Sequence, residues 1–237
     1  MLISALVGIA MNNIVVRSLE DVLQERLFGD QEAESVYRAL GRVNLRGMYV
    51  SALKGERAFG LSVRESAPQG APIAGLIWRP IHYLDGTVYL QQMQKTIDRI
   101  GLSYKQLADS GFAGDSEAET LPRLAYMTQI MVPVFSEARL SMEAASAENA
   151  AGQASMLCEA YRDQVGGYPA SLSEAESKIG WKIPKDPFSG EPLKYQRKGD
   201  GYVIYSIGPN LKDDGGRQPK SSKDISKEGD IVWRVLR

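Results

Sequence analysis

The chain has 237 residues, and 28 Lys and Arg against 29 Asp and Glu give a formal net charge of -1. Hydrophobic residues make up 43% of the sequence, a composition typical of a globular chain and not of a disordered or fibrous one. The near-zero charge provides no general attraction for phosphate backbones, so no nucleic-acid partner is expected. A single cysteine, Cys158, excludes an intramolecular disulfide and zinc sites built from several cysteines.

The amino-terminal segment 1–16 is apolar apart from Asn12 and Asn13. Arg17 ends it before the roughly 20 residues that a membrane-spanning helix requires, and a signal-peptide cleavage site is not evident. Apolar residues at steps of three and four predict a core helix with one buried stripe. The stripe comprises Leu2, Leu6, Ile9, Val16, Leu19, Leu23 and Leu27. We expect any export signal or membrane anchor to lie upstream of Met1.

Three further helices are predicted at 31–43, 49–63 and 87–108. Gly29 and Asp30 would separate the first of these from the preceding helix, as a helix stop followed by an N-cap. The amino-terminal helix and the helices at 31–43 and 49–63 are expected to pack against one another in antiparallel fashion.

A loop or hairpin-like excursion is predicted at 66–83, with Ile77 and Trp78 as its hydrophobic anchor. Its helix breakers are Pro68, Gly70, Pro72, Gly75 and Pro80. A Gly- and acid-rich connection is predicted at 110–120.

A long helix is predicted from Pro133 to Val165, because proline favours a helix start and no other proline follows within this range. Its alanines are Ala138, Ala144, Ala145, Ala147, Ala150, Ala151, Ala154 and Ala160. Small side chains permit close packing, and the same face could also serve as an interaction stripe. With no second thiol, Met142, Met156 and Cys158 are interpreted as core residues and not as a soft-metal site.

Beyond Gly166 the pattern changes from helix to strand. A capping box, Ser171 to Glu174, predicts a short helix that stops at Gly180. A turn at 186–190 should bury Phe188. A hairpin is predicted around Lys198 to Gly201, and a third strand at 231–235.

The predicted fold class is therefore α+β, with a multi-helix region, a long helix and a small three-stranded antiparallel sheet at the C-terminus. We expect two domains: a helical domain at 1–132, and a second domain at 133–237 that contains the long helix and the sheet.

The loop 209–230 between the last two strands is rich in oxygen ligands. Calcium prefers six to eight hard oxygens in a forgiving geometry, which such a loop can supply. The loop also carries five cations against five carboxylates and lacks the EF-hand spacing, which favours a solvated loop with paired charges. Both interpretations stay open at this point.

The ordered pieces of segment 161–233 resemble the C-terminal domain of the type II secretion system major pseudopilin family. The resemblance rests on Gly167-Tyr168-Pro169, Asp186-Pro187-Phe188-Ser189-Gly190, Tyr195, Gly201-Tyr202, Tyr205-Ser206-Ile207-Gly208-Pro209-Asn210, Asp213-Asp214-Gly215-Gly216 and Asp230-Ile231-Val232-Trp233. It covers about a third of the chain. It implies a long helix followed by a small antiparallel sheet, and a periplasmic or cell-envelope location.

In that family the corresponding loop binds calcium through acidic side chains and carbonyls. The resemblance extends this role to Asn210, the Leu211 carbonyl, Asp213, Asp214 and Asp230. Asn210 stands where aspartate is usual, and a lysine-rich insertion at 220–227 lengthens the loop. The chain also departs from the family in lacking a prepilin peptidase site and in its helical first 130 or so residues, so a standard filament subunit is not expected.

The first functional hypothesis is a non-enzymatic structural or interaction protein of the bacterial cell envelope, with protein partners. The second is a helical module that binds a peptide or lipid in a groove lined by Trp78, Tyr83, Tyr89 and the apolar 1–16 stripe. The third is a hydrolase that uses carboxylates, for which the sequence offers Glu20, Glu25, Glu32 and Glu34. No catalytic residue is predicted, because no nucleophile motif accompanies the only histidine, His82, and these glutamates lack the spacing of helix neighbours.

Overall fold

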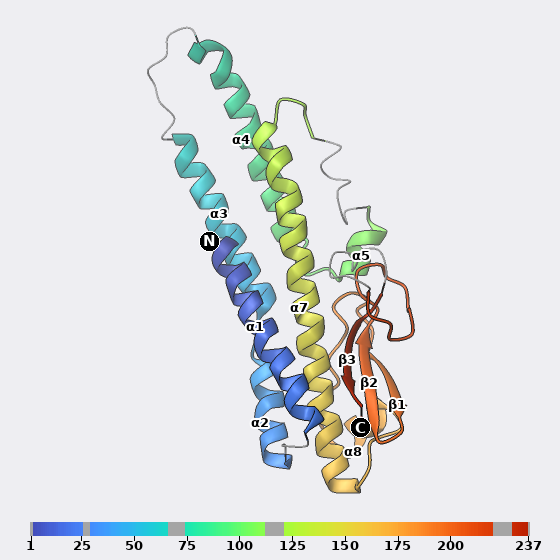
Figure 1. The fold of residues 1–237 in the computed structure, drawn as a ribbon. Coiled ribbons are helices and arrows are strands. Elements are labelled where there is room, and N and C mark those ends of the chain that lie inside the picture. Colours follow the sequence, from blue (N-terminus) through green and yellow to red (C-terminus); the bar gives the residue numbers. More distant parts are fainter. Residues whose placement is uncertain (1, 26–28, 66–73, 112–120, 220–228, 237) are drawn as a thin grey trace. The chain divides into compact units, whose positions relative to one another are not determined.

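The structure is a computed structural model that describes residues 2–25, 29–65, 74–111, 121–219 and 229–236 (Figure 1). Its elements are, in chain order, α1 (Leu2–Gln24), α2 (Asp30–Gly41), α3 (Leu45–Glu65), α4 (Ala74–Asp98), α5 (Tyr104–Asp109), α7 (Tyr126–Val165), α8 (Leu172–Ile179), β1 (Lys194–Lys198), β2 (Gly201–Ser206) and β3 (Ile231–Val235). Long helices dominate and one small sheet closes the chain, which confirms the predicted α+β class.

The sheet is an antiparallel meander with strand order β1-β2-β3. Ile204 in the central strand pairs with Tyr195 on one side and Trp233 on the other. The predicted reversal between β1 and β2 is confirmed, and Gly199 adopts φ 57, which favours glycine. A Cβ on Gly201 would lie 2.0 Å from the Val235 carbonyl oxygen, so the strands can approach here only because that position is glycine.

The chain divides into two compact units. Unit 1 comprises residues 1–7, 46–102 and 106–141, and unit 2 comprises 8–45, 103–105 and 142–237. This division differs from the predicted boundary at 132/133, because most of α1 and all of α2 belong with the sheet.

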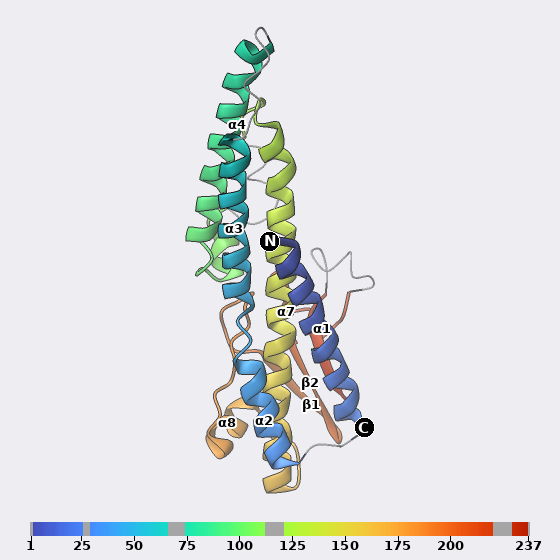
Figure 2. The ribbon, with the colours of Figure 1, turned by 90° about the vertical axis from the view of Figure 1, so that its left-hand side faces the viewer.

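In unit 2 the C-terminal half of α7 forms one wall of the core. Its alanines and Gly152 let neighbouring elements approach: a Cβ added to Gly152 would lie 3.1 Å from Leu40 Cδ1 and 3.4 Å from the Trp233 ring. Figure 2 shows α2 lying along this half of α7. Asn149 and Gln153 fasten the two helices by donating to the carbonyls of Leu40 and Tyr37.

Cys158 and the methionines of α7 lie where the core interpretation placed them. The exposed fraction of Met142, Met156 and Cys158 is 0% for each side chain. The α1 stripe is confirmed for Leu2, Ile9, Val16 and Leu23, which are buried, whereas Leu27 lies outside the described residues.

The predicted start of the long helix at Pro133 is wrong, because α7 begins at Tyr126 and Pro133 lies inside it. The N-cap comes from another helix. Asp85 of α4 accepts hydrogen bonds from the backbone N–H groups of Met127 at 2.8 Å and Thr128 at 3.1 Å. Its carboxylate also accepts from the Thr128 hydroxyl at 2.6 Å. An acid at this end suits the free N–H groups and the helix dipole.

The predicted loop at 66–83 is wrong for 74–83, which form the first turns of α4, with Pro80 inside the helix. Residues 66–73 and the side chains of Ile77 and Trp78 lie outside the described part. The predicted helix 87–108 is divided, because α4 ends at Asp98 and α5 begins at Tyr104. Arg139 donates to the carbonyls of Arg99 at 3.3 Å and Leu102 at 3.0 Å, which fixes the break.

The caps of α8 and α2 can be compared with the cap residues predicted from the sequence. The capping box of α8 is confirmed, since Ser171 Oγ accepts from the Glu174 N–H at 3.2 Å and Gly180 ends the helix at φ 83. For α2, however, the N-cap is Gly29 and not Asp30, and Asp30 is the first helical residue.

Candidate functional site

The β2–β3 loop, the predicted calcium site, is described at 207–219 and 229–230. Its start is pinned by Asp186, which is 2% exposed. The Asp186 carboxylate accepts from the Ser206 hydroxyl at 2.7 Å and from the Ile207 N–H at 3.3 Å. It also accepts from the Phe188 N–H at 3.0 Å, and Phe188 is buried as predicted. The turn at 186–190 therefore fixes where β2 ends.

Asp230 closes the loop from its other end. Its side chain is fully buried and accepts from the Gly216 N–H at 2.7 Å and the Asp214 N–H at 3.3 Å. The Asp230 N–H donates to the Arg217 carbonyl at 2.7 Å. Burial raises the pKa of Asp230, and the nearby carboxylates of Asp214 and Asp213 raise it further, while the two N–H groups oppose the shift.

Asp214 forms the second tie of the loop. Its Oδ2 accepts from the Asn210 amide and from the Gly229 N–H, both at 2.9 Å. The hydrogen bond from Asn210, followed by that from Gly229, lowers the pKa of Asp214. Asp214 and Asp230 thus hold the two ends of the loop together at Gly229.

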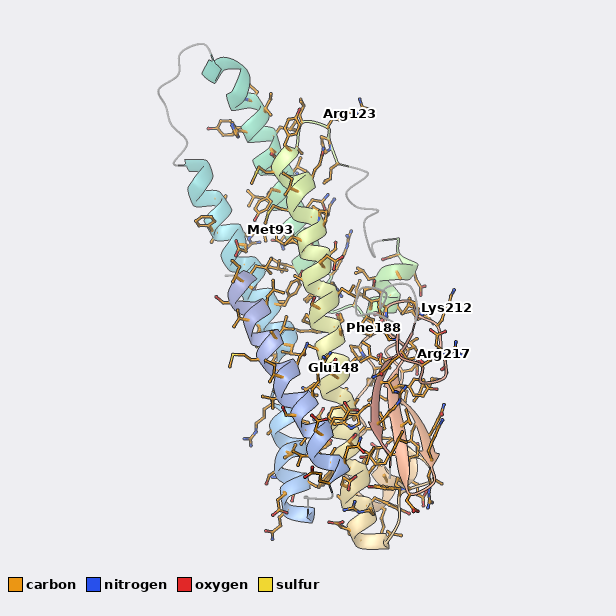
Figure 3. The ribbon with its side chains drawn as sticks, in the orientation of Figure 1. Met93, Arg123, Glu148, Phe188, Lys212 and Arg217 are labelled. Atoms are coloured by element: carbon orange, nitrogen blue, oxygen red, sulfur yellow. The ribbon has the colours of Figure 1, made fainter. Side chains whose placement is uncertain are left out.

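Asp213 is engaged elsewhere. Its Oδ1 accepts from the Tyr205 hydroxyl at 3.1 Å and the Gly215 N–H at 3.0 Å, and its Oδ2 lies 3.8 Å from Lys194 Nζ. Figure 3 labels Lys212 and Arg217, two of the cations that the loop carries. The lysine-rich insertion at 220–227 lies outside the described residues.

The two neutral ligands implied by the resemblance shape the loop turn. Asn210 Oδ1 accepts from the Lys212 N–H at 3.0 Å. Leu211 adopts φ 57, a left-handed conformation that is uncommon outside glycine and orients its carbonyl unlike those of its neighbours. Within the described ranges, no group of three or more His, Cys, Asp or Glu side chains is arranged to hold a metal ion.

A buried polar cluster in unit 2 was not foreseen from the sequence. Glu159 of α7 is 1% exposed, and its Oε1 accepts from the hydroxyls of Tyr168 at 2.8 Å and Tyr202 at 3.1 Å. Arg162 pairs with Glu159 Oε2 at 2.5 Å. Burial, followed by the charge of Glu159, raises the pKa of Tyr168 to about 12. The only sequence signal for this cluster is the spacing of three residues between Glu159 and Arg162, which places the two side chains on one face of a helix.

Glu20, one of the four glutamates considered for catalysis, binds the backbone of β3 at an edge of the sheet. Its Oε1 accepts from the Arg234 N–H at 2.8 Å. Gln24, one helical turn later, donates to the Arg234 carbonyl at 2.8 Å and accepts from the Leu236 N–H at 3.3 Å. Burial raises the pKa of Glu20. The backbone N–H and carbonyl of Arg234 in β3, and the N–H of Leu236 just after it, are thus satisfied by α1.

The other residues considered for catalysis or a binding groove are placed separately. Glu25, Glu32 and His82 are exposed, and Glu34 pairs with Arg38 one turn along α2. Tyr83 is 56% exposed, and Tyr89 is half-buried with its ring 6.1 Å from that of Phe135. The side chain of Trp78 is outside the described part.

No protein-family model, curated protein or solved structure matches this chain.

Proposed function

We propose that this chain is a non-enzymatic structural or interaction protein of the bacterial cell envelope, similar in its C-terminal part to the major pseudopilins of type II secretion. The order of elements in unit 2 supports the proposal: α7, α8, a three-stranded meander and an Asp-rich loop before the last strand. This is the order that the resemblance leads us to expect. Its partners are proteins.

The buried polar groups of unit 2 agree with a structural role. Glu159 binds two tyrosine hydroxyls and an arginine, and Asp186 and Asp230 bind backbone N–H groups. Carboxylates held in this way rigidify a fold: Glu159 and Asp186 each bind a hydroxyl of β2, and Asp230 binds N–H groups from a distant part of its own loop.

We further propose that the β2–β3 loop binds a calcium ion. The ion would be held by Asp214, Asp230, Asn210 Oδ1 and the Leu211 carbonyl, with Asp213 close by. Calcium accepts carboxylate and carbonyl oxygens in flexible geometry. The carboxylates of Asp214 and Asp230 each accept two hydrogen bonds, and a carboxylate has about four lone-pair sites, so each has lone pairs left for an ion. The raised pKa of Asp230 reflects burial beside other carboxylates, which a divalent cation would relieve.

Thermal melting with calcium or a chelator tests the ion. Because calcium would bind only the folded chain, we expect a higher midpoint as calcium increases. Asp214→Asn should reduce this shift, while Asp200→Asn, in the exposed hairpin turn, should keep it. A midpoint that does not move at millimolar calcium would exclude the ion and leave the structural role standing.

Deletion of the gene in the bacterium that encodes the chain tests the secretion role. We expect exported enzymes to accumulate in the periplasm instead of the medium, and the wild-type chain to restore their release. Unchanged release, with the protein verified as missing from the strain, would contradict the proposal whatever the calcium result.

A further inference from the structure

One face of α1 is apolar, exposed and free of charge. Its side chains are exposed to between 52% and 75%, and they are Ile3, Val7, Met11, Ile14 and Val15. The spacing of three and four residues places them on one side of the helix. No charged residue occurs from Leu2 to Val16, and the first, Arg17, is itself largely exposed.

The opposite side of the same helix is held by the protein. Val16 and Leu23 are buried, and Glu20 and Gln24 bond to the backbone of β3. By length and composition, α1 is the one described helix that could cross a membrane. Crossing would expose Glu20 to hydrocarbon and break its bond to Arg234, so the observed packing favours a helix that lies in a membrane surface.

The size of this apolar face favours a lipid surface over a protein as its partner. A strip of five aliphatic side chains presents on the order of a few hundred Å² of apolar surface. A specific protein interface requires about 800 Å² from each partner, usually with aromatic or arginine anchors, which this strip lacks. Membrane adsorption has no such minimum, because it scales with the apolar area buried.

We propose that this face of α1 docks the folded protein onto a lipid bilayer, with Ile3, Val7, Met11, Ile14 and Val15 entering the boundary between headgroups and acyl chains. Arg17, at the end of the strip, pairs with Glu148 at 3.3 Å but is 73% exposed, so its remaining N–H groups can meet lipid phosphates. The attachment uses α1 itself and does not rest on the proposed secretion role.

Flotation of the full chain with vesicles tests the proposal, using phosphatidylcholine alone and phosphatidylcholine mixed with phosphatidylglycerol. We expect binding to both, with a moderate gain on the anionic vesicles from Arg17. Met11→Gln and Ile14→Gln should each weaken partitioning roughly tenfold, since each removes an aliphatic group from the bilayer. Glutamine keeps helix propensity and adds no charge, and unchanged melting midpoints would verify the fold.

Ile130→Gln is the matched control. Ile130 on α7 is 63% exposed against 67% for Ile14, so a general loss of surface hydrophobicity would affect both variants equally. No vesicle binding, or equal weakening by Ile130→Gln, overturns the proposal. Self-association in sedimentation that Ile14→Gln abolishes, without vesicle binding, would assign the face to a second copy instead.

Discussion

A buried carboxylate needs donors of its own, and Asp230 obtains them from the backbone of its own loop. Two N–H groups converge on its oxygens, and its own N–H closes a third bond to Arg217. These two N–H groups oppose the burial that raises the pKa of Asp230, and without the carboxylate they would be left buried and unpaired.

Asp230→Asn should lower the free energy of unfolding by about 1–3 kcal/mol, because an amide places an NH₂ against a backbone donor. Urea denaturation measures the loss. Asp213→Asn is the control: Asp213 accepts both of its hydrogen bonds at Oδ1, which asparagine retains. We expect its effect to stay within about 0.5 kcal/mol, and a loss equal to that of Asp230→Asn would contradict this account.

Removing the charge of Glu148 should stabilise the protein, whereas removing that of Asp230 should destabilise it. Its Oε2 is buried with no hydrogen-bond partner among the described residues, and burial raises its pKa despite the ion pair with Arg17. A folded state that binds a proton more tightly than the unfolded state loses stability as pH rises through the raised pKa. Glu148, labelled in Figure 3, should therefore cost stability at neutral pH.

Glu148→Gln should raise the melting midpoint at pH 7, and the gain should vanish below the ordinary pKa of 4.5, where the wild-type side chain is protonated in both states. Glu34→Gln, which removes an exposed pair with Arg38, should show no comparable pH-dependent gain. A Glu148→Gln gain that persists unchanged at pH 3 would show that packing, and not charge, is responsible.

At the scale of elements, the ends of the long helices are set by side chains from elsewhere in the chain. Asp85 caps the start of α7 from 42 residues away, and Arg139 binds the carbonyls that follow α4. Each bond satisfies backbone groups that a helix end leaves unpaired. Such caps tie two helices together as well as ending one of them.

Asp85→Ala should lower the free energy of unfolding by about 0.5–2 kcal/mol through loss of the cap. Amide hydrogen exchange should rise at Met127 and Thr128 and stay unchanged in α8, whose cap is local. Asp85→Asn keeps one acceptor oxygen for Thr128 but loses the oxygen that serves the Met127 N–H, so it should recover only part of the stability. Equal exchange at Met127 in wild type and Asp85→Ala would show that α7 begins without this cap.

These caps explain what the sequence could and could not predict. The β1–β2 hairpin, α8 and the third strand follow from signals within a few residues, such as the Ser171 capping box and Gly199. The start of α7 does not, since the residue before it is Ala125, a poor cap, and its first N–H groups donate instead to the carboxylate of Asp85. Asn210, Asp214 and Asp230 lie together in the loop, joined by hydrogen bonds, whereas Asp213 turns toward Tyr205, which no local signal in the sequence indicates.

At the scale of the molecule, the core of unit 2 joins segments distant in the chain. Val16 and Leu23 of α1, Cys158 of α7 and Trp233 of β3 belong to one buried cluster. Exposure of any member requires the helices and the sheet to separate. The single thiol is therefore a reporter of the integrity of the whole unit.

Cys158 should react with a thiol reagent at least about a thousandfold more slowly in the native protein than in denaturant. Burial removes access and raises the pKa of the thiol, which reduces the reactive thiolate. Asp200→Cys in a Cys158→Ala background, exposed in the hairpin turn, should react at once. Rapid labelling of native Cys158 would mean that unit 2 opens readily.

The seam between α1 and β3 has a practical consequence for shortened versions of the protein. The opposite border of the sheet, β1, exposes Lys194, Arg197 and Lys198, charges that discourage strand addition. β3 relies instead on Glu20 and Gln24, more than 200 residues earlier in the chain. A fragment trimmed of its first 25 residues would leave the Arg234 N–H and carbonyl and the Leu236 N–H without these partners, an open strand edge on which copies can stack into insoluble aggregates.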